Sequence, residues 1–216
     1  MAIPNYSYID TELSAINTIL GTIGQAPIQG IDLENPEVSL IYNILQESSL
    51  DVQAEGWSFN REEHITVVPD ANGFIEIPAN ALHYDISDGQ SLRTKDVTIK
   101  NGRLYDKVEH TDVFTSSVEI DVVWQFGFDL DLANRANVGH SIPAVFKRYI
   151  IAKASTRAAT QLITNPDLAQ VLAQQEALAR SICMEYECNQ GDHNYLGMGH
   201  NSSYKTYQPY QALSRI

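Results

Sequence analysis

Residues 35–60, NPEVSLIYNILQESSLDVQAEGWSFN, mark the point where a helix must give way to extended chain. The opening Asn35-Pro36-Glu37 is typical of a helix start, because Asn caps, Pro fits the first turn and Glu favours the positive end of the helix dipole. Gly56 permits the positive φ angle that ends a helix, and the two aromatic residues after it can pin the junction. The stretch predicts a helix of about 20 residues, roughly 30 Å long. Its buried side is predicted from an apolar stripe: Val38, Ile41, Leu45 and Val52.

Three further helices are expected on either side of a different kind of chain. The first covers about 11–23, with Asp10 as the expected N-cap and Gly24 at its end. The third covers about 141–164. The fourth covers about 165–188 and repeats the Asn-Pro-acid start of the second helix.

Residues 59–132 are rich in β-branched and aromatic residues and are punctuated by turn residues, which is typical of strands. Asn101-Gly102 is typical of a two-residue hairpin turn. Strict alternation over 118–122 predicts a strand with one wet face. The expected strands are Ile65–Val68, Phe74–Ile77, Val97–Ile99, Leu104–Tyr105 and Val118–Trp124.

This order of elements predicts an α+β fold. We expect a four-helix bundle, made by the N-terminal and C-terminal helix pairs and interrupted by an antiparallel β insertion. The expected parts are the N-terminal helices at 1–58, the β insertion at 59–140, the C-terminal helices at 141–190 and a tyrosine-rich arm at 191–216.

Charge is distributed unevenly along the 216 residues, whose net charge is −13. Residues 1–60 hold eight acids and no Lys or Arg, residues 61–132 hold fourteen acids and six bases, and residues 133–216 hold five acids and eight bases. Tight DNA binding depends mainly on neutralising phosphates, so an acidic protein is a poor candidate for it. An acidic protein could still line a passage through which DNA slides without sticking.

Apolar stretches and cysteines bear on the compartment in which the chain folds. We find no stretch near the ~18 consecutive apolar residues of a membrane span, and no secretion signal at the N-terminus. Folding in a cytoplasm, without a membrane partner, is therefore expected. Cys183 and Cys188 would point roughly 140° apart on a helix, which predicts two free thiols.

Several stretches, in order from residue 13 to about 195, resemble the phage tail tubular protein A family. They are LSAINTILGTIG at 13–24 followed by Pro27; GWSFN at 56–60 leading to Glu63, Ile65-Thr66 and Pro69-Asp70; Lys153-Ala154-Ser155; and Ala179-Arg180 through CMEYE at 183–187 to Asn194-Tyr195.

The resemblance implies a structural protein of the virion tail and not an enzyme. It implies a dodecameric ring of copies of this chain between the portal protein and the tail nozzle, tail tubular protein B. The helical bundle would stack against the portal, the β region would lie toward the nozzle and the tail fibre protein, and DNA would pass non-specifically through the channel during ejection. Such a protein would be made and assembled in the host bacterial cytoplasm.

Two sets of residues are candidates for contact with partners. The arm at 191–216 is either a disordered end or, as we favour, a segment that orders against the portal through Tyr204, Tyr207 and Tyr210, because tyrosines are good interface residues. The third helix carries bases and no acid. These bases would contact DNA in the channel or, as we favour, pair with acids of the same or a neighbouring subunit: Lys147, Arg148, Lys153 and Arg157.

Catalytic and metal-binding patterns are weak. The spacing of Cys183, Cys188, His193 and His200 matches no usual zinc pattern, and Asp129 and Asp131 lack an EF-hand context. We expect no metal and no cofactor. The alternative function is a virion-associated glycan hydrolase that uses carboxylates of the β region, around Glu62-Glu63-His64.

Overall fold

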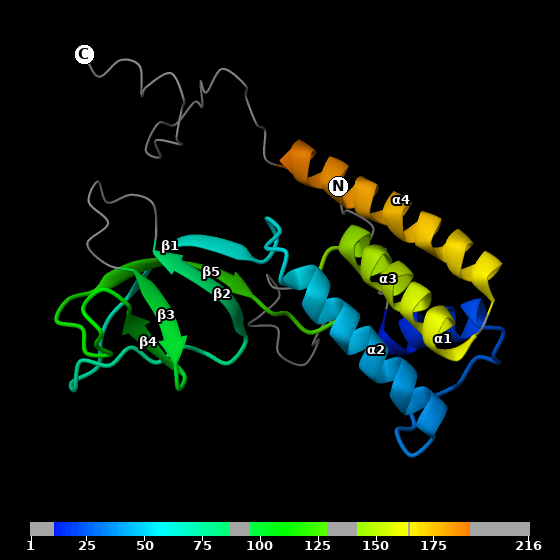
Figure 1. Cartoon of the computed structure of the whole chain (residues 1–216), viewed down its shortest axis with the longest axis horizontal. Helices are drawn as coiled ribbons and strands as arrows, with labels where there is room; N and C mark the ends of the chain where they lie inside the picture. Colours follow the sequence, from blue (N-terminus) through cyan, green and yellow to red (C-terminus); the bar gives the residue numbers. More distant parts are fainter. Residues whose placement is uncertain (1–10, 87–95, 129–141, 164, 191–216) are drawn as a thin grey trace, which may run out of the picture. The chain divides into compact units, whose positions relative to one another are not determined.

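The computed structural model describes residues 11–86, 96–128, 142–163 and 165–190. In these residues two helices are followed by five strands and then by two more helices (Figure 1). A mixed α+β fold is therefore confirmed. The chain divides into two compact units, which we describe separately. The helical unit is formed by the chain up to Asn60 and by Trp124–Tyr186, and the β unit is formed mainly by Arg61–Val123.

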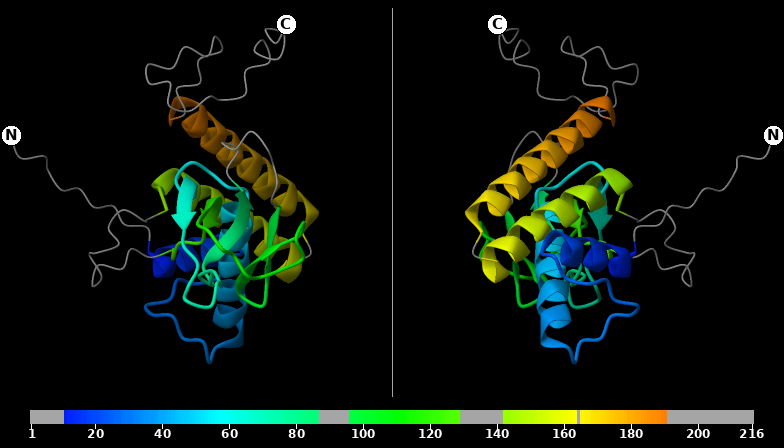
Figure 2. Two further views of the ribbon diagram at one scale, coloured as in Figure 1. Left: turned by 90° about the vertical axis from the view of Figure 1, so that its left-hand side faces the viewer. Right: turned by 90° about the vertical axis from the view of Figure 1, so that its right-hand side faces the viewer.

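Helices α1, α2 and α3 of the helical unit pack side by side (Figures 1 and 2). Their shared core contains Ile16, Ile41 and Phe146, which are fully buried. Helix α4 joins this core through fewer side chains, chiefly Cys183 and Tyr186. The helix bounds are α1 Glu12–Thr22, α2 Pro36–Gln53, α3 Ala144–Leu162 and α4 Pro166–Gln190.

Side-chain caps explain where three of these helices begin. The Asn35 Oδ1 accepts a hydrogen bond from the Glu37 N–H at 3.0 Å, as the sequence predicts. The Asn165 Oδ1 accepts from the Asp167 N–H at 3.1 Å. The prediction that Asp10 caps the first helix is wrong, because the Thr11 hydroxyl occupies that position and accepts from the Ser14 N–H at 3.2 Å.

The β unit contains a three-stranded sheet in the order β1-β5-β2 and a two-stranded sheet, β3-β4. Strands β1 and β5 are antiparallel, with Val67 opposite Val118. Along β5 the side chains of Val118, Ile120 and Val122 are buried while Glu119 is exposed, which confirms the alternation expected there. The strand bounds are β1 Arg61–Val67, β2 Ala81–Ile86, β3 Val97–Lys100, β4 Arg103–Asp106 and β5 Val118–Trp124.

The predicted hairpin is confirmed. Strands β3 and β4 are antiparallel, with Lys100 opposite Arg103, so Asn101 and Gly102 alone form the turn. Both turn residues have positive φ angles, 54° and 75°, as a twist-matched two-residue turn requires.

The strand predicted at Phe74–Ile77 is wrong. This segment makes only an isolated bridge between Glu76 and Arg103. It lies between the tight turn at Gly73 and Pro78, which has no N–H to donate, so a regular ladder cannot extend. Strand β2, Ala81–Ile86, was not predicted, because its sequence ALHYDI has few β-branched residues.

A β-bulge interrupts β1 where the register shifts between Glu62 and Ile65. His64 adopts a positive φ angle of 60° at this point. The Asp121 side chain of β5 accepts a hydrogen bond from the His64 N–H at 2.9 Å. This bond replaces the backbone partner that the His64 N–H would have in a regular ladder.

Candidate interaction surface on the helical unit

The end of α2 is held by the Gly56-Trp57-Ser58-Phe59 motif. Gly56 has a φ angle of 74°, as predicted for a helix end. The indole Nε1–H of the buried Trp57 donates to the Val52 carbonyl at 2.7 Å, and its ring lies 5.0 Å from that of Phe146. The Phe59 ring lies 4.6 Å from the same Phe146 ring. Both aromatic residues therefore pin the junction to α3, and the structural interpretation of the motif is confirmed.

Two buried amides next to this motif were missed by sequence reasoning. The Gln53 side-chain amide accepts from the Phe126 N–H at 2.7 Å and donates to the Phe126 carbonyl at 3.0 Å. It therefore forms the same pair of hydrogen bonds with this backbone that a residue of a neighbouring β-strand would form. The Asn60 amide donates to the carbonyls of Gln53 and Trp124, each at 2.8 Å. These amides tie the chain that leaves the helical unit to the chain that returns to it. In the sequence, the two amides appear only as polar residues next to apolar or aromatic ones, which does not predict that they are buried.

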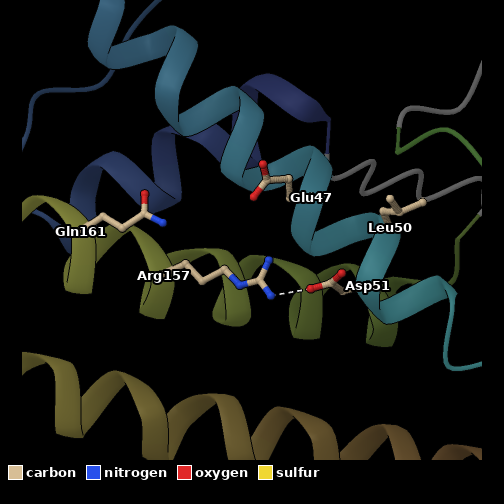
Figure 3. Close-up of a pocket in the computed structure, with 5 residues that line it drawn as sticks. All are labelled: Glu47, Leu50, Asp51, Arg157 and Gln161. Carbon is tan, nitrogen blue, oxygen red and sulfur yellow. Dashed lines mark hydrogen bonds and ion pairs between the residues drawn. The ribbon is translucent and has the colours of Figure 1, made fainter.

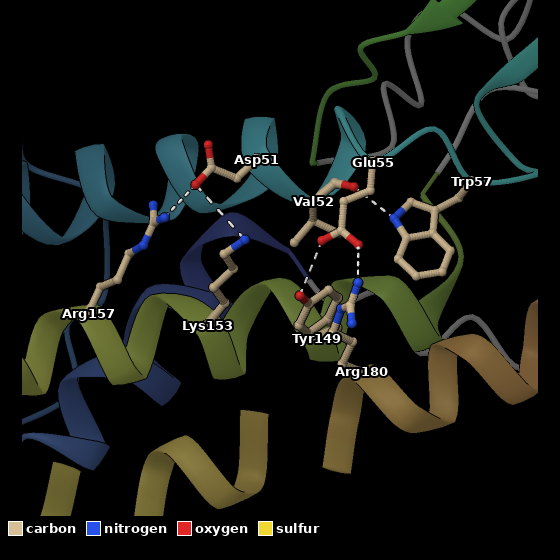
Figure 4. Close-up of polar contacts among 8 residues, drawn as sticks. All are labelled: Asp51, Val52, Glu55, Trp57, Tyr149, Lys153, Arg157 and Arg180. Carbon is tan, nitrogen blue, oxygen red and sulfur yellow. Dashed lines mark hydrogen bonds and ion pairs between the residues drawn. The ribbon is translucent and has the colours of Figure 1, made fainter. Parts of the chain in front are cut away.

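A charged cluster joins α2 to α3 (Figure 4). The Asp51 carboxylate forms an ion pair with Arg157 and lies 3.9 Å from the Lys153 ammonium. All three side chains are partly exposed, so each pair contributes little to stability by itself. Two of the predicted bases thus contact an acid of the same chain.

A second cluster joins Glu55, which lies just beyond the end of α2, to α3 and α4. The Glu55 carboxylate accepts from Arg180 at 3.0 Å and from the Tyr149 hydroxyl at 3.3 Å (Figure 4). Burial, with the neighbouring negative charge of Glu55, raises the pKa of Tyr149 to about 12. The hydrogen bond to Glu55 also raises the pKa of Arg180, so both donors keep their protons at neutral pH. Sequence reasoning did not single out this cluster.

The other two predicted bases behave differently. Lys147 is buried, and its ammonium lies 4.8 Å from the centre of the Phe128 ring. Arg148 is exposed. The four bases of α3 therefore do not form one continuous basic face. Their assignment to the subunit interface or to the channel stays a prediction.

A surface pocket of about 390 Å³ lies between α2 and α3 (Figure 3). Leu50 is its apolar wall, and the Asp51–Arg157 pair crosses it. Asp51 and Arg157 compensate each other's charge, and Glu47 adds a further acid to the lining. The lining residues are Glu47, Leu50, Asp51, Arg157 and Gln161.

Several candidate residues lie outside the described residues, namely Asp129, Asp131, His193, His200, Tyr204, Tyr207 and Tyr210. In the part of the chain that is described, Cys183 and Cys188 form no disulfide, and no group of three acids, His or Cys could hold a metal ion. The same part contains no helix with the length and apolar character that a membrane crossing requires.

The acids proposed for a hydrolase are surface residues in the described structure. Glu62 and Glu63 are exposed, and the Glu63 carboxylate lies 3.3 Å from Arg61. His64 lies 3.8 Å from Glu119 on the neighbouring strand. Exposed carboxylates, one of them beside an arginine, lend no support to the hydrolase alternative.

Comparison with known proteins identifies the family. Residues 13–193 match the family model described as "Tail tubular protein", which covers well over half of the chain. The chain belongs to the tail tubular protein family. Tail tubular protein A of Klebsiella phage KP34 is 32% identical to it over 126 residues. These residues are 58% of this chain and 64% of that relative, so less than two thirds of the relative's length is spanned. As a member of this family, the chain is a structural protein of a phage tail.

Proposed function

We propose that this tail tubular protein is an adaptor subunit. Copies of it would form a dodecameric ring that joins the portal protein to the tail nozzle and lines the channel for DNA ejection. The match to the tail tubular protein family over residues 13–193 carries this proposal. The net charge of −13 also suits a channel wall, since DNA must slide past it without binding.

The arrangement of the helical unit supports the portal-facing role. The Glu55 cluster connects the chain just beyond the end of α2 with α3 and α4, while α1 packs on α2 and α3. We propose that the four helices act as one bundle that stacks on the portal, and that the β unit faces the nozzle and the tail fibre protein. In this proposal the chain keeps the division at 1–58, 59–140, 141–190 and 191–216.

The C-terminal arm would supply further contact with the portal through Tyr204, Tyr207 and Tyr210. Tyrosine combines a large apolar surface with a hydrogen-bonding hydroxyl, which suits an interface. Assembly would take place in the host bacterial cytoplasm.

Electron microscopy of the full chain mixed with its portal tests the proposal. We expect rings stacked on the portal in the mixture. Deletion of residues 196–216 should weaken portal binding. If no ring forms with or without the portal, the adaptor function is wrong. If the deletion leaves portal binding unchanged, only the role of the arm is wrong.

A further inference from the structure

Helix α4 carries an apolar stripe on a side that does not face the core. Val171, Leu178 and Ile182 are exposed by 50%, 62% and 46%. Each residue of an α-helix advances by about 100°, so these three side chains lie within roughly 40° of one another. The buried side of α4, which contains Leu172 and Cys183, is centred about 110° away. The stripe is therefore a separate face of the helix, and the described part of the chain leaves it largely open.

Two acids border this stripe. Asp167 and Glu185 are exposed, and both lie on the same edge of the stripe, about 40° from its centre. They are 18 residues apart on the helix, so about 27 Å separates them along its axis. Neither acid forms an ion pair with a base of the described residues. A segment that fits this face is therefore apolar and carries a positive charge near each end.

The sequence that follows α4 contains such a segment. Residues 193–216 include no Asp or Glu, and their only Lys and Arg residues are Lys205 and Arg215. Ten residues of fully extended chain span about 33 Å. The two bases can therefore reach both acids of α4 if the chain between them is slightly less than fully extended.

The side chains between the two bases match the stripe in their order. Alternate residues of an extended chain share one side, so Tyr207, Pro209 and Leu213 lie on the side of the bases. If the ten residues span 27 Å, these three lie about 5, 11 and 22 Å from Lys205. The three stripe residues lie about 4.5, 10.5 and 21 Å from Glu185 along the helix axis. Each apolar residue of the segment thus meets one residue of the stripe.

We propose that residues 205–215 fold back in an extended form along α4 of the same chain and cover the stripe. Lys205 pairs with Glu185, and Arg215 pairs with Asp167. The segment runs antiparallel to α4, since its first base meets the acid nearer the end of the helix.

The connection between α4 and this segment favours a contact within one chain. Residues 191–204 link the two, and three of these 14 residues are glycines, which ease a reversal of direction. A short flexible tether holds the segment near the helix at an effective concentration in the millimolar range. A second copy at micromolar concentration competes poorly with that, so the segment of the same chain is the occupant.

The inference concerns the single subunit and does not rest on the proposed ring. It refines the part that the arm would play with the portal. Tyr207 would lie on the stripe, whereas Tyr204 and Tyr210 would lie on the opposite side of the extended segment and stay available to a partner.

Cysteine pairs in the full chain test the position of the segment. All variants carry Cys188→Ser, because that thiol is exposed. The pair Gln175→Cys, Gln211→Cys spares every residue placed in the contact. In the control pair, Ala173→Cys replaces Gln175→Cys, which moves the exposed helix cysteine about 160° around α4 but only about 3 Å along it. We expect the first pair to form an intramolecular disulfide at least about tenfold faster than the control. Loss of free thiols gives the rate, and non-reducing gels show whether the product is a monomer.

A charge swap tests the ion pairs with the same crosslink. Glu185→Lys should slow disulfide formation by about threefold or more, because it removes an attraction and adds a repulsion at an exposed site. Adding Lys205→Glu should restore the original rate, which a change in helix stability alone would not produce.

Three results would overturn the inference. Equal rates for the two cysteine pairs would show that the segment has no preferred side of α4. A charge swap without rescue would reject the pairing of Lys205 with Glu185. Disulfide-linked dimers in place of monomers would assign the stripe to a second copy. The adaptor function would stand in each case, because it is tested separately with the portal.

Discussion

Gln53 connects two segments that are 73 residues apart in sequence by pairing its amide with the backbone of Phe126. The side chain is fully buried, and it also donates to the Ser49 hydroxyl at 3.0 Å. A substitution at this position therefore leaves two backbone groups of Phe126 without their partner. Such a loss is costly because the freed groups are partly shielded from water.

We predict that Gln53→Leu, which keeps the side-chain volume, lowers the free energy of unfolding by about 1–3 kcal/mol. Urea denaturation followed by circular dichroism measures the change. Gln170→Leu, on an exposed position of α4, is the control and should change stability by less than about 0.5 kcal/mol. Equal effects of the two substitutions would contradict the role assigned to Gln53.

Two glycines with positive φ angles offer a second comparison at the scale of single residues. A Cβ atom on Gly73 would lie 2.7 Å from the Val113 Cγ1 and 3.2 Å from the Phe114 carbonyl oxygen. A Cβ atom on Gly102 would meet nothing within 4 Å. The two φ angles are similar, 85° and 75°, so the difference between the sites is steric.

We expect Gly102→Ala to destabilise the protein by about 1–2 kcal/mol, the cost of the left-handed backbone alone. Gly73→Ala should cost about 2–4 kcal/mol, because the steric overlap adds to the same backbone strain. Thermal denaturation of the two variants in parallel gives the comparison. If Gly73→Ala is as stable as Gly102→Ala, the chain at Val113 and Phe114 moves away from the new Cβ atom without a cost in free energy.

At the scale of elements, helix α4 depends on the Glu55 cluster, because only Leu172 and Cys183 among its described side chains are buried. The Tyr149 hydroxyl and the Arg180 guanidinium both donate to Glu55. The pKa of Tyr149 is raised from its ordinary value of 10.0 to about 12. A group whose pKa is raised by folding stabilises the folded protein fully below the unfolded pKa and loses this effect as pH rises through the folded pKa.

The stability that Tyr149 contributes should therefore disappear between about pH 10 and pH 12. In Tyr149→Phe the free energy of unfolding should be lower at pH 8, and it should fall less steeply than that of the wild type over this range. Urea denaturation across the pH series, with Tyr42→Phe as the control, checks this. Identical pH profiles of Tyr149→Phe and the wild type would reject the assignment.

At the scale of the whole molecule, the acidic charge bears on how DNA can pass. Three bases of the helical unit lie against carboxylates: Lys153 and Arg157 against Asp51 of α2, and Arg180 against Glu55 just beyond the end of α2. Their charges are thus compensated within the chain, and the net charge of −13 repels a polyanion. The charge of the chain therefore favours only weak and transient contacts with DNA.

We predict that the isolated full chain shows no saturable binding to a short DNA duplex at about 0.15 M salt. Proteins with basic surfaces bind DNA non-specifically with a Kd of about 10⁻⁴–10⁻⁶ M under such conditions. Fluorescence anisotropy with a labelled duplex measures this, and a basic DNA-binding protein serves as the positive control. Salt-sensitive binding in the micromolar range would favour a nucleic-acid-binding function for the exposed Arg148 and its neighbours.

Local chemistry made several features of the fold predictable. The Asn-Pro-acid helix starts at Asn35 and Asn165 and the Asn101-Gly102 hairpin depend on residues within a few positions of each other. The error at the first helix start, Thr11 in place of Asp10, is a shift of one residue between two good caps. Family membership was also predictable, because it depends on ordered motifs and not on contacts.

The tertiary structure alone decided the rest, because those features depend on residues that are far apart in sequence. The Asp51–Arg157 pair spans 106 positions and the Glu55–Arg180 pair spans 125. Strand β2 forms beside β5 although its own sequence is poor in β-branched residues, since a neighbouring strand outweighs a weak local preference. Capping, turn chemistry and ordered motifs therefore made the helix starts, the β3-β4 hairpin and the family predictable from the sequence. Packing decided which acids meet which bases and which face of α4 remains exposed.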